Sequence, residues 1–441
     1  MTSPLLSLVQ ALLPDFNTRI VLAGVTLLGA ASGWIGTFLL LRKRALLGDA
    51  LSHATLPGIA LAFCLMLSLG GSGKWLPGLL LGAALSGALG CITILALRRI
   101  RKIDDDAAMG IVLSVFFGAG VVLLGWAQAQ PGGSAAGLES FIYGKTASMV
   151  QADVLWITLL SALALLTSLL LFKELRLLCF DEAFGRATGW PMGRLDLILA
   201  TLVTLVTVAG LQAVGLILVI AFLITPAAAA RFWTHRLGST ASLAAIMGAL
   251  CGAVGASLSA LLPKAPAGAI IVLTTSVCFA FSLLFGTKRG LLPRWLEQHR
   301  QRQRMKLHHL LRAAYETIEH RPSDPPPEIP IADLLRARSW TRPQIEAVLR
   351  QAEARHWIRR SGLNSIQLTP SGLAEATRIT RTHRLWEAYL IHYADIAPSH
   401  VDRDADAVEH ILRPEIIAEL EAALSLHGPV PSPHPTQRHH P

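Results

Sequence analysis

The chain has 441 residues, of which 52% are hydrophobic and 15% are charged, and its net charge is +10. This balance excludes an ordinary soluble protein and indicates a large membrane-embedded part. Residues 301–441 carry 18 Lys and Arg against 17 Asp and Glu, so the basic excess is not the footprint of a nucleic-acid-binding domain. The five cysteines stand singly, which argues against disulfides and thiolate metal sites.

A helix that spans a membrane needs about 20 predominantly apolar residues. Residues 1–290 contain nine such segments, or eight or ten if the 193–231 run is undivided or an N-terminal segment is added; we expect that run to divide near Gly210 to Gly215. The expected spans are 19–41, 46–68, 76–97, 109–129, 152–172, 193–210, 212–231, 239–262 and 267–286. The expected fold class is an all-α polytopic membrane domain followed by a smaller soluble part.

Basic clusters follow the odd-numbered spans, while the intervening loops are short, glycine-rich and nearly uncharged. The basic clusters are 42–44, 98–102, 173–194, 231–236 and 288 onward. Loops on the cytoplasmic side of a membrane are enriched in Lys and Arg. The alternation therefore predicts an N-terminus outside the membrane and a C-terminal part in the cytoplasm.

The second span contains the most informative stretch, RALLGDALSHATLPGIALAF, at residues 44–63. Asp49 and His53 lie four residues apart, so a helix places both side chains on one face. Ionisable groups inside a membrane segment are costly and usually face a cavity, a partner or an ion. A carboxylate and an imidazole together form a plausible half-shell for a divalent transition metal.

Pro57 strengthens this interpretation, because proline removes the N–H that would bond the carbonyl of His53. At membrane depth a freed carbonyl is tolerated where it lines a cavity or finds another partner. The alternative is a capped, kinked helix end, in which Asp49 is a helix-start residue and His53 is hydrogen-bonded within the bundle.

The cytoplasmic loop at 180–190, FDEAFGRATGW, carries acidic residues ahead of Arg186 and two aromatic residues at a helical spacing. A short polar helix here would dock on a cytoplasmic partner, or it is an ordinary interfacial helix. Further along the chain, Asp104 to Asp106 open the fourth span, where the macrodipole favours acidic residues. Asp196, near the start of the sixth span, is a weaker intramembrane candidate.

Two stretches only partly match a phosphate-binding loop. Lys74 lacks a following Ser or Thr, and Lys145 would require glycine at position 139, which is Glu139. We therefore expect no nucleotide on this chain, which is not an enzyme by itself, and an ATPase partner if ATP drives it.

The membrane half closely resembles the metal-ion ABC permeases, the membrane subunits of bacterial zinc, manganese and iron importers. The matching stretches are RALLGDALSHATLPGIALAF, DDAAMGIVLSVFFGAGVVLL, FDEAFGRATGW and VGLILVIAFLITPAAAAR. The resemblance implies a multi-pass protein of the bacterial plasma (inner) membrane, with a second permease copy or paralogue, cytoplasmic ATPase subunits and an extracytoplasmic metal-binding protein. It implies that Asp49 and His53 coordinate the metal in transit. It also implies that an ATPase-coupling helix contains Phe180, Asp181, Glu182, Phe184, Gly185 and Arg186.

The remaining chain divides into a winged helix-turn-helix-like part at 298–370, a helical part at 371–428 and a disordered tail at 429–441. The pattern predicts helices at 308–318, 331–336 and 341–356, then strands at 357–359 and 365–368. A long helix at 371–394 and one or two more at 402–425 follow.

Liganding side chains gather in these last helices. His383 and Glu387 are four residues apart, and Asp402, Asp406 and Glu409 share a stripe with His410 beside it. Two facing stripes of this kind hold one or two divalent ions. The alternative is solvated helix faces with i,i+4 charge pairs.

The segments LHHLLRAAYE, QLTPSG, HRLWEAYL and DRDADAVEH resemble the iron- and manganese-dependent repressors of the diphtheria-toxin-repressor family. That resemblance implies dimerisation and two regulatory metal sites. One site would contain His309, Asp406, Glu409 and His410, and the other His383, Glu387 and Asp402.

Three of these positions depart from the family pattern. His309 stands where iron sensors have Met and manganese sensors Asp, Asp406 replaces Cys or Glu, and Asp402 replaces His. The identity of the metal therefore stays open among manganese, iron and zinc, both as the transported substrate and as a regulator.

The rival hypothesis is a membrane-tethered, metal-responsive DNA-binding regulator. A small basic face would then consist of Arg342, Arg350, Arg355, Arg359 and Arg360. Because the domain is nearly neutral, we do not expect DNA as a partner. An intramembrane metallohydrolase is disfavoured because no HExxH motif occurs.

Overall fold

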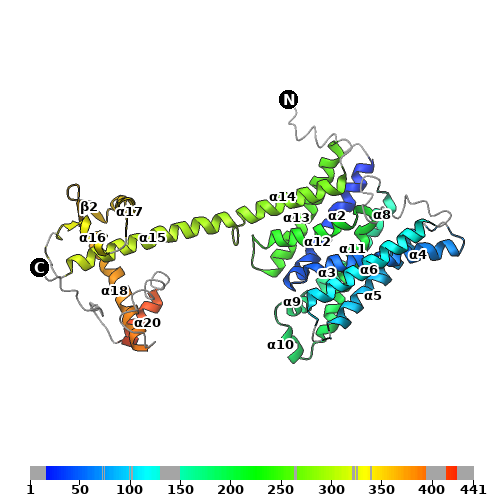
Figure 1. The fold of residues 1–441 in the computed structure, drawn as a ribbon, viewed down its shortest axis with the longest axis horizontal. Coiled ribbons are helices and arrows are strands. Elements are labelled where there is room, and N and C mark those ends of the chain that lie inside the picture. The colour runs from blue at the N-terminus through cyan, green and yellow to red at the C-terminus, as the bar shows by residue number, and fades with distance from the viewer. Residues whose placement is uncertain are drawn as a thin grey trace. The chain divides into compact units, whose positions relative to one another are not determined.

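The computed structural model describes residues 16–71, 73, 75–98, 100, 103–129, 149–262, 266–319, 323, 326–337, 340–393 and 414–424. The chain forms two compact units, residues 1–294 and 295–441 (Figure 1). This boundary falls between the expected domain limits of 290 and 298. The expected subdivision of the second unit remains a prediction.

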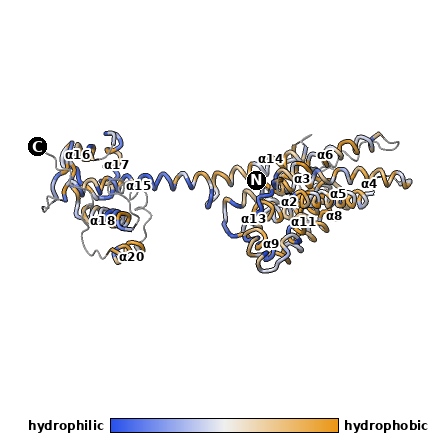
Figure 2. The backbone as a smooth tube through the Cα atoms, turned by 60° about the horizontal axis from the view of Figure 1, so that its bottom comes forward, coloured by the Kyte–Doolittle hydropathy of each residue, from blue (hydrophilic) through white to orange (hydrophobic). Residues whose placement is uncertain are grey.

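The first unit is a bundle of long apolar helices. Their bounds are α2 (Phe16–Leu41), α3 (Ala45–Ala54), α4 (Leu56–Ser68), α5 (Leu76–Leu97), α6 (Asp105–Gln128), α8 (Gln151–Leu170), α11 (Met192–Val214), α12 (Leu216–Ala230), α13 (Leu237–Leu261) and α14 (Ala267–Phe285). Among the described residues, eight segments are long and apolar enough to cross a membrane, and Leu218–Ala230 is a shorter apolar helix. Hydrophobic residues dominate these helices in Figure 2. The predicted membrane fold is confirmed, with α3 and α4 together forming one span.

Helix α2 lies against α12 and α13, and small residues allow that close approach (Figure 1). A Cβ atom at Gly29 or Gly33 would collide with the backbone carbonyl of Gly248 or Ala244 on α13. Small residues at such positions let membrane helices pack backbone to backbone. The interface between α2 and α13 is therefore built on glycine and alanine contacts.

The expected division of the 193–231 run occurs at Gly215, which separates α11 from α12. Gly215 has φ of +80°, a conformation that side-chain-bearing residues rarely adopt. The helix therefore breaks at Gly215, the C-terminal end of the predicted interval.

The second unit has a small sheet among helices. Its elements are α15 (Leu291–Ile318), β1 (Ile329–Pro330), α16 (Ile331–Ala337), α17 (Arg342–Ala354), β2 (Ile358–Arg360), β3 (Ser365–Leu368), α18 (Pro370–Tyr393) and α20 (Pro414–Leu424). The strands follow the antiparallel order β1-β3-β2, with Ile329 opposite Ile366 and Ile358 opposite Leu368. A separate apolar core lies beneath this sheet. The winged-helix prediction is confirmed, and β1 is an additional strand.

Two details differ from the sequence prediction. Helix α15 begins at Leu291 rather than His308, because residues 297–304 within it are all polar and interrupt the apolar pattern that marks its two ends. Residues 402–413 and the tail at 429–441 lie outside the described residues, so α20 represents the last predicted helices.

Candidate functional site

Asp49 and His53 lie on α3, within a span that the chain interrupts at Thr55. Arg44 occupies the N-cap position of α3, so Asp49 is five residues inside the helix rather than at its start. Pro57 lies in the first turn of α4, where a missing N–H costs least. The break therefore lies at Thr55, two residues after His53.

Hydroxyl groups satisfy the backbone around this break. Thr55 Oγ1 donates to the Ser52 carbonyl at 2.6 Å, and Ser86 Oγ of α5 donates to the Ala54 carbonyl at 2.6 Å. Irregular backbone inside a membrane is tolerated where such partners replace the helix bonds. The interruption is thus held by neighbouring side chains.

The two predicted ligands face one another across one helical turn. His53 Nε2 lies 3.3 Å from Asp49 Oδ1, and the two side chains are 18% and 29% exposed. The edge of the His53 ring packs on Phe117 of α6, with centroids 4.7 Å apart and an interplanar angle of 77°. His53 Nδ1 is buried and, among the described residues, has no hydrogen-bond partner. The partial exposure of the two side chains still leaves an ion access to the Asp49 carboxylate and to the Nε2 side of the imidazole.

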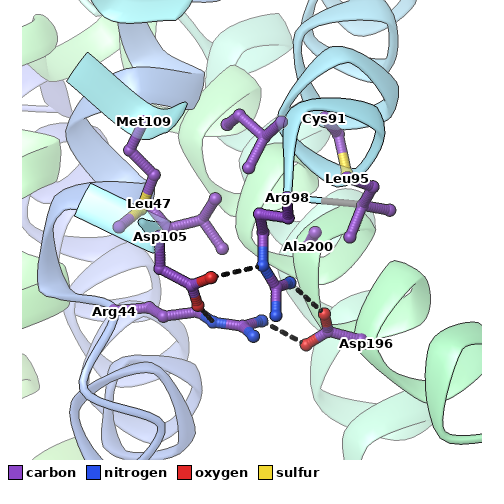
Figure 3. Close-up of a pocket in the computed structure, with 10 residues that line it drawn as sticks. Arg44, Leu47, Cys91, Leu95, Arg98, Asp105, Met109, Asp196 and Ala200 are labelled. Atoms are coloured by element: carbon purple, nitrogen blue, oxygen red, sulfur yellow. Dashed lines mark hydrogen bonds and ion pairs between the residues drawn. The ribbon is translucent and has the colours of Figure 1, made fainter. Parts of the chain in front are cut away.

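A set of six charged side chains, which we call the ionic cluster, lies at the cytoplasmic ends of the helices. Its members are Arg42, Arg44, Arg98, Asp105, Glu182 and Asp196. In Figure 3, Arg44 and Arg98 both point toward Asp105 and Asp196. Arg98 Nε lies 2.7 Å from Asp105 Oδ1, and Arg98 Nη1 lies 2.8 Å from Asp196 Oδ2.

The sequence interpretation did not connect these residues. It assigned the arginines to topology, Asp105 to a helix dipole and Asp196 to a weak intramembrane candidate. In the structure Asp196 is 9% exposed and also reaches Arg44 and Arg42, the latter at 3.4 Å. A buried carboxylate requires such partners. An acidic residue at the cytoplasmic start of an apolar span, with basic clusters on the same side, was the available signal.

The predicted coupling segment, residues 180–190, contains the last residue of α9 (Phe172–Phe180) and all of α10 (Glu182–Ala187), at one edge of the membrane unit (Figure 1). Asp181 caps α10, because its Oδ1 accepts a hydrogen bond from the Phe184 N–H at 2.8 Å. Phe180 ends α9 and Phe184 lies in α10, so they do not share one helix, yet both are exposed. Gly185 is buried against Met192.

Glu182 connects α10 to the membrane helices. Its carboxylate lies 2.7 Å from Arg42 Nη1 and also pairs with Arg186. Burial raises the pKa of the Glu182 carboxyl, but the hydrogen bonds from Arg42 and Arg186 outweigh burial and hold that pKa below its usual value. Glu182 is therefore a charged anchor at neutral pH.

In the second unit, His383 Nε2 lies 3.2 Å from Glu387 Oε1 on α18, and these side chains are 3% and 2% exposed. The guanidinium of Arg312, from α15, lies 2.7 and 2.8 Å from the two ring nitrogens of His383. His309 precedes Arg312 by three residues on the same helix. The other predicted ligands, Asp402, Asp406, Glu409 and His410, lie outside the described residues.

No group of three His, Cys, Asp or Glu side chains with metal-site geometry occurs among the residues that the structure describes. His383 and Glu387 nevertheless fit a metal shell as two donors, one nitrogen and one oxygen. The positive charge of Arg312 would have to move away from His383 for a cation to bind there.

The predicted basic face is partly neutralised within the domain. Arg360 lies 2.7 Å from Glu346 and 3.5 Å from Glu353, both on α17, the helix that a winged helix would place against DNA. Arg342 bonds Asn364, and Arg355 lies over the ring of Trp357. The DNA-binding alternative is not favoured.

The sequence profile of the ABC 3 transport family matches residues 15–286. The profile of the iron dependent repressor, metal binding and dimerisation domain matches residues 369–437. The first profile thus covers most of the membrane unit, and the second covers the C-terminal part of the second unit.

Membrane proteins of metal transport systems match either nearly the whole chain or about two thirds of it. The chain is 38% identical over 415 residues to the manganese transport system membrane protein MntC of Bacillus subtilis (strain 168), which covers 94% of this chain and 93% of that protein. It is 42% identical over 281 residues to the zinc transport system membrane protein TroC of Treponema pallidum (strain Nichols), covering 64% of this chain and 93% of that protein. A chain in the structure of PsaBC from Streptococcus pneumoniae in complex with Fab matches with a TM-score of 0.57 and 30% identity, over 67% of this chain and 99% of that one.

Proposed function

The chain belongs to the ABC 3 transport family, and from this premise we propose that Asp49 and His53 bind the divalent metal that it carries into the cytoplasm. The chain is the membrane subunit of an ABC transporter for metal ions, with a repressor-type domain at its C-terminus. The resemblances to both families are thereby confirmed. So is the multi-pass membrane location.

The observation that carries the proposal is the accessible Asp49–His53 pair directly before a helix break. The 3.3 Å separation lets the two side chains share one cation, and the hydroxyl-supported break at Thr55 fixes them in place. Water or a second permease copy would complete the shell of the metal. Oxygen and imidazole donors without thiolate suit manganese, iron or zinc.

Metal uptake by cells tests this assignment. We expect Asp49→Asn and His53→Gln to lower uptake by at least about tenfold, the lower end of the effect of losing even an outer-shell partner of a metal. Ser52→Ala is the matched control, because Ser52 Oγ bonds only within α3, to the Gly48 carbonyl at 2.6 Å. Competition among manganese, iron and zinc in wild-type cells identifies the substrate, and undiminished uptake by both variants would refute the site.

ATP hydrolysis is proposed to come from cytoplasmic partner subunits that receive α10. Phe180 and Phe184 expose apolar rings at that point, while Asp181 and Glu182 fix the short helix by capping and by the ion pair to Arg42. An extracytoplasmic binding protein and a second permease subunit complete the proposed assembly. Cross-linking of a cysteine at position 184 to the ATPase tests the docking, with position 43 as a control on the same side.

For the C-terminal unit we propose metal sensing that regulates transport. The support is the buried His383–Glu387 pair within the segment that matches the repressor metal-binding profile. His383 and Glu387 would hold the metal together with ligands from residues 402–410. Its binding would supply a fixed positive charge beside His383 and Glu387.

A melting experiment on the complete chain tests the sensing role. Added Mn²⁺ should raise the melting temperature of the second unit, and His383→Ala should remove the increase without changing the metal affinity of the Asp49–His53 pair. A shift of equal size in wild type and His383→Ala would contradict the role of this pair.

A further inference from the structure

The ionic cluster connects the helix that is proposed to dock on the ATPase, α10, with the helix that is proposed to bind the metal, α3. Consecutive ion pairs run from Glu182 on α10 to Arg42, from Arg42 to Asp196 on α11, and from Asp196 to Arg44. Arg44 is the N-cap residue of α3, the helix that carries Asp49 and His53. One chain of charges therefore joins the proposed ATPase-docking helix to the proposed metal-binding helix.

The length of this connection is short. Asp49 and His53 lie five and nine residues beyond Arg44, which on an α-helix is about 8 and 14 Å along the axis. The space beside the cluster is a cavity of about 10 Å³, lined by Leu47, Cys91, Ile94 and Met109 as well as by the charges. That volume holds about one water molecule. On this side, therefore, the start of α3 packs closely against the cluster and its apolar neighbours.

Stability alone does not account for these charges. Arg42, Arg44 and Asp196 have side chains that are only 8–9% exposed, and the cluster balances three guanidinium groups with three carboxylates. Buried ion pairs stabilise a fold no better than apolar side chains of the same volume would. They differ from apolar packing in being directional, since removing one member leaves a buried charge without its partner. A displacement of one member thus forces the others to rearrange.

We propose that Arg42, Asp196 and Arg44 are positioning residues for transport: they transmit the movement of α10 to α3, and so set where Asp49 and His53 lie during the ATP cycle. The inference rests on the proposed function of α3 and α10. In this arrangement Asp196 holds the cytoplasmic ends of α2, α3 and α5 on α11. A shift of α10 acts on Asp196 through Glu182 and Arg42.

The experiment uses the complete transporter, reconstituted with its ATPase and binding protein in vesicles, with manganese uptake and ATP hydrolysis measured on the same samples. We expect Asp196→Asn and Arg42→Gln to lower the metal transported per ATP by about tenfold, within the 5- to 150-fold range of coupling between sites. The metal concentration at half-maximal uptake should not change. Asp196→Glu and Arg42→Lys should restore the ratio, and Asp106→Asn, an exposed neighbour outside the cluster, should leave it unchanged.

Each outcome decides whether the cluster couples ATP hydrolysis to metal transport or only stabilises the fold. A wild-type ratio in both charge-neutral variants overturns the proposal, and so does a parallel loss of protein, uptake and ATP hydrolysis that Asp196→Glu and Arg42→Lys do not restore. Asp49→Asn separates this from the proposed function, because it should abolish equilibrium binding of Mn²⁺ to the membrane unit while Asp196→Asn retains it. If Asp49→Asn binds and transports normally, the metal site is wrong, whatever the cluster variants show.

Discussion

The two units of this chain each contain a carboxylate and an imidazole four residues apart on a helix. In the membrane unit, His53 and Asp49 are 3.3 Å apart, 18% and 29% exposed, and next to a helix break. In the second unit, His383 and Glu387 are 3.2 Å apart, but they are 3% and 2% exposed and lie against the guanidinium of Arg312. The same chemistry therefore stands in an accessible place and in a buried one.

This difference teaches what environment does to a potential metal site. An accessible pair can exchange a cation quickly, because its ligands need no rearrangement before the ion enters. A buried pair with a neighbouring guanidinium must lose that positive charge before it accepts another. The first arrangement suits an ion in transit, and the second suits a site whose occupancy changes the structure around it.

The largest effect should follow from breaking the buried pair. Glu387→Ala removes the carboxylate that lies 3.2 Å from His383 in a buried place, beside the guanidinium of Arg312, and we expect it to destabilise the second unit by about 3–5 kcal/mol. Hydrogen exchange of α18 in the full-length protein measures this. Glu375→Ala is the control, since the Glu375–Arg378 pair lies on the surface of the same helix and should cost at most about 1 kcal/mol. Equal hydrogen exchange in Glu387→Ala and Glu375→Ala would show that the buried His383–Glu387 pair stabilises the unit no more than the surface Glu375–Arg378 pair does.

The accessible pair should show the reverse pattern. His53→Ala is expected to reduce uptake by about 10- to 100-fold, yet to leave hydrogen exchange of α3 close to wild type, because His53 and its partner Asp49 are both partly exposed. Uptake and exchange are measured on the same membranes. A large rise in exchange would mean that His53 is a structural residue, as the alternative interpretation of a kinked helix end holds.

Removing the competing charge should sharpen the comparison. Arg312→Met keeps the volume and the apolar stem but deletes the guanidinium beside His383. We expect the metal affinity of the second unit to rise about fivefold to tenfold. A tenfold change in affinity has the same free energy as a shift of about one pKa unit, the scale of effect that a neighbouring charge has on a titrating group. Isothermal titration with Mn²⁺ on the full chain, in the Asp49→Asn background, isolates this site. Unchanged or weaker affinity would show that Arg312 does not compete with the metal.

The smallest of these effects is expected for Glu182, whose carboxylate is only partly buried. Glu182→Gln should cost about 0.2–1 kcal/mol, because Glu182 is 31% exposed and Arg42 keeps a second carboxylate, that of Asp196. Its pKa is held below the usual value, so the ion pair contributes fully at neutral pH and is lost only as the pH falls through that lowered pKa. Thermal melting of wild type and Glu182→Gln should therefore differ equally at pH 8 and pH 7 and converge in acid. A difference that disappears already between these two values would contradict the assignment.

Apolar patterning predicted the membrane fold well. Any helix that crosses the hydrocarbon core needs about 20 predominantly apolar residues, whatever its neighbours in the bundle are. It also predicted the break in the second span and the division before α12, since Pro57 and Gly215 restrict the backbone locally. It placed the start of α15 too late, because the polar residues 297–304 interrupt the apolar pattern of that helix. The local sequence thus determined the helices and strands and most of the residues at which they begin and end.

By itself the sequence determined the i,i+4 pairs Asp49–His53 and His383–Glu387, because a helix brings such residues together regardless of what surrounds it. Only the tertiary structure decided that one pair stays accessible and the other lies buried beside Arg312. Only it joined Arg42, Arg44 and Arg98 to Asp105, Glu182 and Asp196, from segments up to 154 residues apart. Contacts of that separation depend on how the helices pack against one another, and no local pattern carries that information.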